Sequence, residues 1–321
     1  MSRFAWLMRR EFWEHRAIWI APAVVLGLLL LGAVTGNVFM GEIRIDADTE
    51  IGGAPVPAGH GQESAGAEGS VRVLGAGEAL ELVPPEKREG LLAVIYAAVA
   101  GVMFVVLGSI GFVYSLDALY ADRRDRSVLF WKSLPLSDTE TVLAKFCVAA
   151  VAIPVLAAAA SIAGQLIIAT GGSVKLALTG GDASLMWLPQ VIGSGAAAAV
   201  MMAVICAFWY APVTAYLLLA SAWAPKSPFL WAVLPPIALS MLEKIAFGSS
   251  HVSAFLKDRM GAPLGALFAD DNVKSGALQP FDLASGIAEL LVSPGTLLGL
   301  VGAAALLAAA IWVRRYRDET T

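Results

Sequence analysis

The sequence has few charged residues for its length. Of its 321 residues, only 15% are Asp, Glu, Lys or Arg, whereas 58% are hydrophobic. A soluble globular domain carries about 25% charged residues. This chain has too little charge to cover a water-facing surface, so much of its surface is expected to face lipid. The composition argues against a soluble enzyme and a disordered chain, and a net charge of −4 argues against a nucleic-acid binder.

Residues for metal binding and covalent chemistry are also scarce. Cys147 and Cys206 lie in apolar runs, which predicts small buried side chains rather than a disulfide framework. The three histidines are scattered over different predicted loops and form no metal-ligand motif. The motifs G-x-x-x-x-G-K-S/T, H-E-x-x-H and G-x-S-x-G do not occur. We therefore expect a chain that is not an enzyme, with no nucleotide site and no cofactor of its own.

The sequence contains instead six long apolar runs. A bilayer core about 30 Å thick needs about 20 apolar helical residues. The runs cover residues 17–40, 91–116, 142–170, 191–222, 229–247 and 297–313. The fourth run is too long for one straight crossing, so we expect it to tilt, kink or break near Pro212. The sequence thus predicts an all-α polytopic membrane protein with a single domain of six transmembrane helices.

The distribution of basic residues predicts the orientation. With both termini inside, 13 of the 22 Lys and Arg residues fall in short inner segments, and eight are spread over much longer outer segments. This bias predicts that both termini are cytoplasmic. The outer segment 41–90 holds ten acidic and four basic residues, and we interpret it as either a solvated spacer or a surface for an extracytoplasmic partner. The outer segment 248–293 contains apolar patches that predict short interfacial or re-entrant helices.

The inner loop between the second and third runs, residues 117–141, has the most information. A dense mixed-charge cluster precedes a short apolar stretch and a Ser-Leu-Pro-Leu-Ser turn. Ser137 and Glu140 form a capping-box pattern that would start the third span. We expect a short helix along the inner membrane face, which either anchors to lipid headgroups or docks a soluble partner. The N-terminal segment also suits an interfacial helix, although Glu11 and His15 fall on its apolar side.

Ionisable residues are rare within the runs themselves. Glu243 and Lys244 lie near the outer end of the fifth run. They can reach the interface, or they can provide a polar contact in a translocation pathway. Glu243 is also the residue on which an intramembrane enzyme would depend.

Two stretches resemble the permease subunits of type 2 ABC transporters, in the exporter-like branch. Residues 7–22 read LMRREFWEHRAIWIAP and are similar to the start of that family, an inner-face helix leading into the first span. Residues 122–146 read DRRDRSVLFWKSLPLSDTETVLAKF and resemble the family's loop between spans two and three. These motifs cover about one-eighth of the chain, and the six-run layout covers all of it.

The resemblance implies a partner-dependent machine in the bacterial cytoplasmic membrane. The permease would dimerise, with a second copy or a sister permease, and two cytoplasmic ATPase subunits would bind ATP and Mg²⁺. Substrates in the family are diverse, and the other neighbours expected are membrane lipids, with no nucleic acid. The segment implied as the coupling helix that docks on the ATPase comprises Asp122, Arg123, Arg124, Asp125, Arg126, Ser127, Phe130, Trp131, Lys132, Ser133, Leu134 and Pro135. The alternative is a non-transport structural or mechanotransmission subunit that acts on an extracytoplasmic partner.

Overall fold

A computed structural model describes residues 3–35, 43–46, 71–74, 85–125, 137–178, 180–267 and 288–316. Within these ranges the elements are helices, apart from two short strands in the outer segment 41–90. Strand β1 (Ile43–Asp46) pairs antiparallel with β2 (Val71–Leu74). The all-α prediction therefore holds for the helical bundle, and the strand pair is a small addition to it.

Helices account for the rest of the described chain. Their bounds are α1 (Arg3–Glu14), α2 (Ala17–Thr35), α4 (Pro85–Arg124), α6 (Asp138–Cys147), the π-helical turn η1 (Val148–Ala152), α7 (Ile153–Leu178), the 3-10 turn η2 (Ala183–Met186), α8 (Pro189–Phe208), α9 (Ala211–Trp223), α10 (Pro228–Phe247), α11 (His251–Leu267) and α14 (Pro294–Tyr316). Six helical segments are long and apolar enough to cross a membrane, and each overlaps one of the predicted runs. The chain is thus built as a multi-pass membrane protein.

Helix α7 lies at the centre of the bundle. It belongs to the candidate membrane span Asp138–Leu178, half of whose most apolar part is buried. It contacts α2, α4 and α8. Many of its buried residues are Ala, Gly or Ser, which allow helices to approach closely inside a membrane. Gly171 shows how close the approach is, because a Cβ there would lie 2.5 Å from the Cβ of Ala33 on α2.

The fourth apolar run is broken, as its length predicted. Helix α8 ends at Phe208 and α9 begins at Ala211, with Pro212 in the first turn of α9. Proline is favoured in a first turn because it has no amide hydrogen to leave unpaired. The two residues at the break bind α11: the Trp209 indole Nε1 donates to the Arg259 carbonyl at 2.8 Å, and the Tyr210 hydroxyl donates to the Met260 carbonyl at 3.1 Å.

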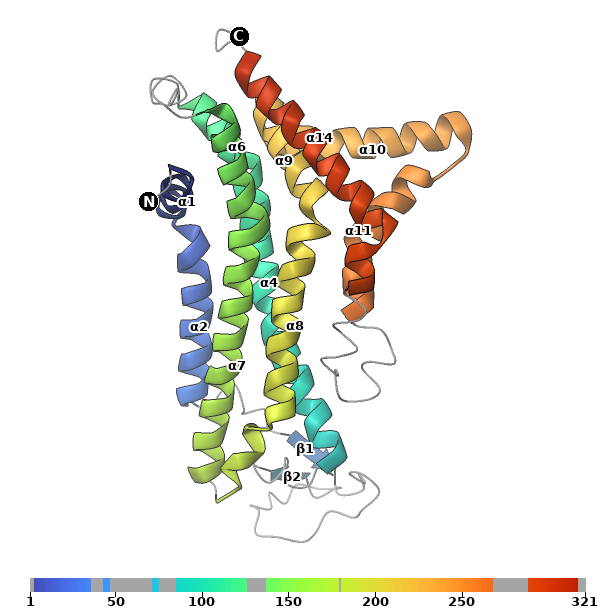
Figure 1. The fold of residues 1–321 in the computed structure, drawn as a ribbon. Helices are drawn as coiled ribbons and strands as arrows, with labels where there is room; N and C mark the ends of the chain where they lie inside the picture. The colour runs from blue at the N-terminus through green and yellow to red at the C-terminus, as the bar shows by residue number, and fades with distance from the viewer. Residues whose placement is uncertain are drawn as a thin grey trace.

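Helix α10 lies across the axis of the bundle rather than along it, and α11 then runs back toward α8 (Figure 1). The only buried residue of α10 is Ala232, so most of its apolar side chains are exposed. Helix α14 packs along α9. Both chain ends lie toward the same end of the bundle, opposite the strand pair (Figure 1), and we call this the terminal end.

The prediction that the second helix ends before residue 117, where the inner loop was expected to start, is wrong. Helix α4 continues through the charged residues to Arg124. The helix can continue because the Asp122 and Arg123 side chains turn inward and find partners there, as described below. Residues 126–136 lie outside the described residues. The next helix begins at Asp138 with the predicted capping box, in which Ser137 Oγ accepts from the Glu140 amide and the Glu140 carboxylate accepts from the Ser137 amide.

Candidate functional site: an ion-pair chain at the terminal end

A buried carboxylate on the N-terminal helix is the first member of the site. Glu11 on α1 is 1% exposed. Its Oε1 lies 2.8 Å from Arg10 Nη2, and its Oε2 accepts a hydrogen bond of 2.9 Å from the Tyr114 hydroxyl on α4. The His15 ring packs edge-on against Tyr114, with 4.7 Å between ring centroids. A carboxylate on the apolar side of an amphipathic helix is thereby satisfied by partners on two helices.

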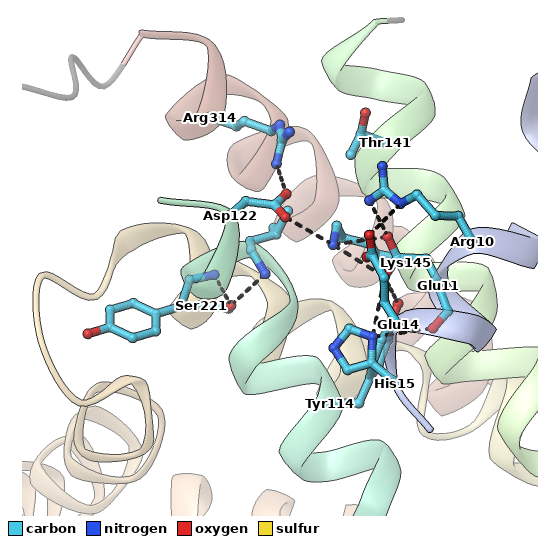
Figure 2. Close-up of polar contacts among 12 residues, drawn as sticks. Arg10, Glu11, Glu14, His15, Tyr114, Asp122, Thr141, Lys145, Ser221 and Arg314 are labelled. Atoms are coloured by element: carbon cyan, nitrogen blue, oxygen red, sulfur yellow. Dashed lines mark hydrogen bonds and ion pairs between the residues drawn. The ribbon is translucent and has the colours of Figure 1, made fainter. Parts of the chain in front are cut away.

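Lys145 links α1 to α4. It lies near the end of α6 and is 1% exposed. Its Nζ lies 3.2 Å from Glu11 Oε1 and 3.6 Å from Asp122 Oδ1 (Figure 2). The ammonium therefore sits between two carboxylates from different helices. A buried ammonium is retained in a folded protein only with such compensation.

Arg314 on α14 closes the site. Its Nη1 lies 2.9 Å from Asp122 Oδ2, and its Nε donates to Asp138 Oδ1 at 3.0 Å. Asp122 is in the last turn of α4 and Asp138 is the first residue of α6. One guanidinium thus bridges the two ends of the segment that connects α4 to α6.

These contacts form one continuous series, which we call the ion-pair chain. Its members are Arg10, Glu11, Lys145, Asp122, Arg314 and Asp138. Basic and acidic groups alternate along it, three of each kind. It joins α1, α4, α6 and α14, which come from widely separated parts of the sequence. Breaking one member leaves a buried charge without full compensation, which makes such a network costly to disrupt.

Arg123 connects the same region to α9. Its Nη2 donates to the carbonyls of Ser221 at 2.7 Å and Ala224 at 2.9 Å, at the carboxyl end of α9. The Ser221 hydroxyl oxygen accepts from the Leu119 and Tyr120 amides of α4. A cation at a helix carboxyl end satisfies terminal carbonyls and interacts favourably with the helix dipole.

The predicted coupling residues therefore divide into two sets. Asp122 and Arg123 turn into the bundle, whereas Arg124 and Asp125 are exposed and bind each other at 3.0 Å. The outward pair is exposed, while the inward pair anchors the end of α4. The remaining predicted coupling residues lie outside the described residues: Arg126, Ser127, Phe130, Trp131, Lys132, Ser133, Leu134 and Pro135.

Glu243 and Lys244, the predicted polar-pathway pair, lie near the end of α10, which contributes no member to the ion-pair chain. Glu243 accepts hydrogen bonds of 2.7 Å from the Ser249 hydroxyl and from the His251 and Val252 amides. It therefore caps the start of α11. Lys244 is exposed.

The site is suited to holding helices together rather than to metal binding. Glu11, Glu14 and His15 place ligand atoms within 4.8 Å of one another. The ammonium of Lys145 already lies 3.2 Å from the Glu11 carboxylate, and the Arg10 guanidinium binds both acids. A cation added there would have to displace these groups.

Sequence reasoning did not identify the ion-pair chain, although two signals pointed to it. Glu11 interrupts the apolar side of α1, and Lys145 interrupts the third apolar run. Each is a charge where the helical period predicts burial, so each required a partner. The partners could not be paired from sequence, because Lys145 is 134 residues from Glu11.

Comparisons of the chain with protein-family models, with curated proteins and with solved structures find no match.

Proposed function

We propose that this chain is the membrane-spanning subunit of an ATP-driven transporter of the type 2 ABC class, in the exporter-like branch. In this proposal it dimerises and docks separate cytoplasmic ATPase subunits at the terminal end. The observation that carries the proposal is the Arg314 bridge. It ties Asp122, at the end of α4, and Asp138, at the start of α6, to the same helix.

This bridge gives the segment 126–136 a mechanical role in the proposal. A force applied to that segment by a bound ATPase would reach both of its anchored ends. From Asp122 it passes to Lys145 and Glu11, and from Arg123 to the end of α9. Movement of a loop would thus become movement of α1, α4, α6, α9 and α14 together, because buried paired contacts resist independent displacement.

The exposed pair at the end of α4 is the proposed contact with the ATPase. Arg124 and Asp125 expose more than half of their side chains at the terminal end. Surface charges on such an interface steer association and fix its register. This chain carries no Walker sequence, so the proposal places ATP binding on a separate subunit.

The experiment is purification of the tagged full chain in mild detergent, with mass spectrometry of the proteins that accompany it. We expect a stoichiometric ATPase that carries G-x-x-x-x-G-K-S/T. The double variant Arg124→Glu with Arg126→Glu should release that ATPase while the chain still inserts in the membrane. The matched control is Lys175→Glu, a charge reversal in the last turn of α7. This turn lies at the end of the bundle opposite the terminal end (Figure 1), so the variant should keep the ATPase bound.

Two results would contradict the proposal. One is a chain that purifies alone or with extracytoplasmic proteins only, which would favour a structural subunit. The other is normal ATPase binding and activity in the double variant, which would refute the assignment of this contact.

A further inference from the structure

Arg259 is a buried cation that forms no ion pair within the described part of the chain. It lies on α11 and is 3% exposed. Its Nη1 donates to the Gly295 carbonyl at 3.2 Å. Its Nε and Nη2 are buried and make no hydrogen bond, and no acidic side chain among the described residues forms an ion pair with it. A buried guanidinium in apolar surroundings normally marks a binding site or an ion pair.

The surroundings hold this guanidinium in place. Its Cζ lies 4.4 Å from the centroid of the Trp209 ring, at the break between α8 and α9. On the other side, Gly299 of α14 makes room for it, because a Cβ at Gly299 would overlap Nη2 and lie 2.8 Å from Cζ. Burial lowers the pKa of Arg259, although a guanidinium remains protonated at neutral pH. The chain therefore keeps a positive charge at this position and leaves two of its donors unused.

An apolar groove of about 540 Å³ has Met260, the residue that follows Arg259, in its lining. Its walls come from α4, η1, α7, α8 and α9, with Met260 from α11, and no charged side chain lines it. The hydroxyl groups of Ser115, Thr214 and Tyr210 all donate to backbone carbonyls within the protein. Ligand sites in proteins typically have volumes of about 300–1,000 Å³. The groove therefore suits an apolar chain and offers nothing to a polar solute.

Adjacent residues link the groove to the cation. Met260, which lines the groove, follows Arg259 in the chain, and Tyr210, which also lines it, follows Trp209. The two hydrogen bonds from Trp209 and Tyr210 to successive carbonyls of α11 fix this arrangement. A ligand that satisfies both features needs an anionic group joined to an apolar chain.

We propose that Arg259 binds the phosphate of an anionic phospholipid whose acyl chain occupies this groove. Guanidinium donors match phosphate oxygens in geometry and charge, and Nε and Nη2 are the donors of Arg259 that have no hydrogen bond. The bilayer supplies this ligand laterally. The site concerns binding by this chain alone, whether or not an ATPase drives it.

The test is native mass spectrometry of the full chain in mild detergent, without ATPase. The probes are dioleoyl phosphatidylglycerol and dioleoyl phosphatidylcholine, which share chains and a phosphate but differ in net charge. We expect the chain to prefer phosphatidylglycerol, and Arg259→Gln to weaken that binding by about tenfold, the value of a charge-assisted hydrogen bond. Arg259→Lys should retain part of the preference.

Two pairs of glycine variants test the same site without removing the arginine. Gly299→Ala should displace the guanidinium and weaken phosphatidylglycerol binding, whereas Gly302→Ala on the same helix has open space at its Cβ and should not. Gly108→Leu should fill the groove and reduce the binding of both lipids. Its control is Gly27→Leu on α2, which also has open space at its Cβ and does not line the groove.

These pairs decide the proposal even where Arg259→Gln fails to fold. Equal binding of the two lipids by the wild-type chain would overturn it. So would phosphatidylglycerol binding that is unchanged in Gly299→Ala or in Gly108→Leu. Full competition by millimolar inorganic phosphate would also overturn it, because the acyl chain would then contribute nothing. Loss of ATPase binding elsewhere would leave these results unaffected, so the two proposals fail separately.

Discussion

Replacing Lys145 with Met removes the central cation of the ion-pair chain and leaves a side chain of similar length. Lys145 lies between the carboxylates of Glu11 and Asp122, at 3.2 and 3.6 Å. Removing one partner from a buried ion pair costs about 3–5 kcal/mol when the other charge is left uncompensated. Here Glu11 keeps Arg10, and Asp122 keeps Arg314. We therefore expect the lower end of the range, a loss of about 3 kcal/mol in the free energy of unfolding.

The assay is thermal unfolding of the purified chain in detergent, followed by the fluorescence of its nine tryptophans. In a large domain about 1 kcal/mol lowers Tm by about 2 °C, so we expect Lys145→Met to lower Tm by about 6 °C. Lys145→Arg keeps the charge and should lose much less. Lys226→Met removes an exposed lysine and should change stability by less than about 0.5 kcal/mol.

A double-mutant cycle with Glu11→Gln isolates the contact itself. Residues in one ion-pair network interact by about 0.5–3 kcal/mol, so the double variant should be more stable than the sum of the two single losses predicts. A Lys145→Met chain as stable as wild type, or a cycle in which the losses simply add, would refute the reasoning that this network holds the helices together.

Two further predictions concern other contacts. Gly171→Ala should destabilise the chain by about 1–3 kcal/mol, because the added Cβ overlaps Ala33 and forces α2 away from α7. Thermal unfolding measures the loss, and an unchanged Tm would show that α2 moves freely. The control is Gly27→Ala, which has open space at its Cβ and should not lower Tm. Glu243→Gln should weaken the cap of α11 by about 0.5–2 kcal/mol and speed hydrogen exchange at the first turn of that helix. Unchanged exchange there, measured against Glu14→Gln as a control on α1, would contradict the capping role.

Local patterns in the sequence were enough to predict much of the fold. The six apolar runs each overlap a long apolar helix, because helical length and hydrophobicity are properties of contiguous residues. The capping box at Ser137 and Glu140 and the break beside Pro212 are confirmed for the same reason. Each depends on residues within one helical turn.

The candidate site was not predictable, because its contacts join residues far apart in the chain. Asp122 lies in the same charged cluster as Arg124, and the sequence alone does not show that one turns inward and the other outward. That distinction depends on where α14 delivers Arg314, 192 residues later. The orientation of α10 across the bundle was also missed, since an apolar helix has the same composition whether it lies along its neighbours or across them (Figure 1).

The order in which the ion-pair chain is synthesised has a consequence for biogenesis. Glu11, Asp122, Asp138 and Lys145 all leave the ribosome well before Arg314, which closes the bridge between α4 and α6. Until α14 is inserted, Asp122 and Asp138 lack the guanidinium that holds them in the finished fold. A nascent chain halted before residue 314 would therefore carry these acids in a loosened terminal end. Such an end would be open to quality-control proteases until α14 completes the contacts that join α1, α4 and α6.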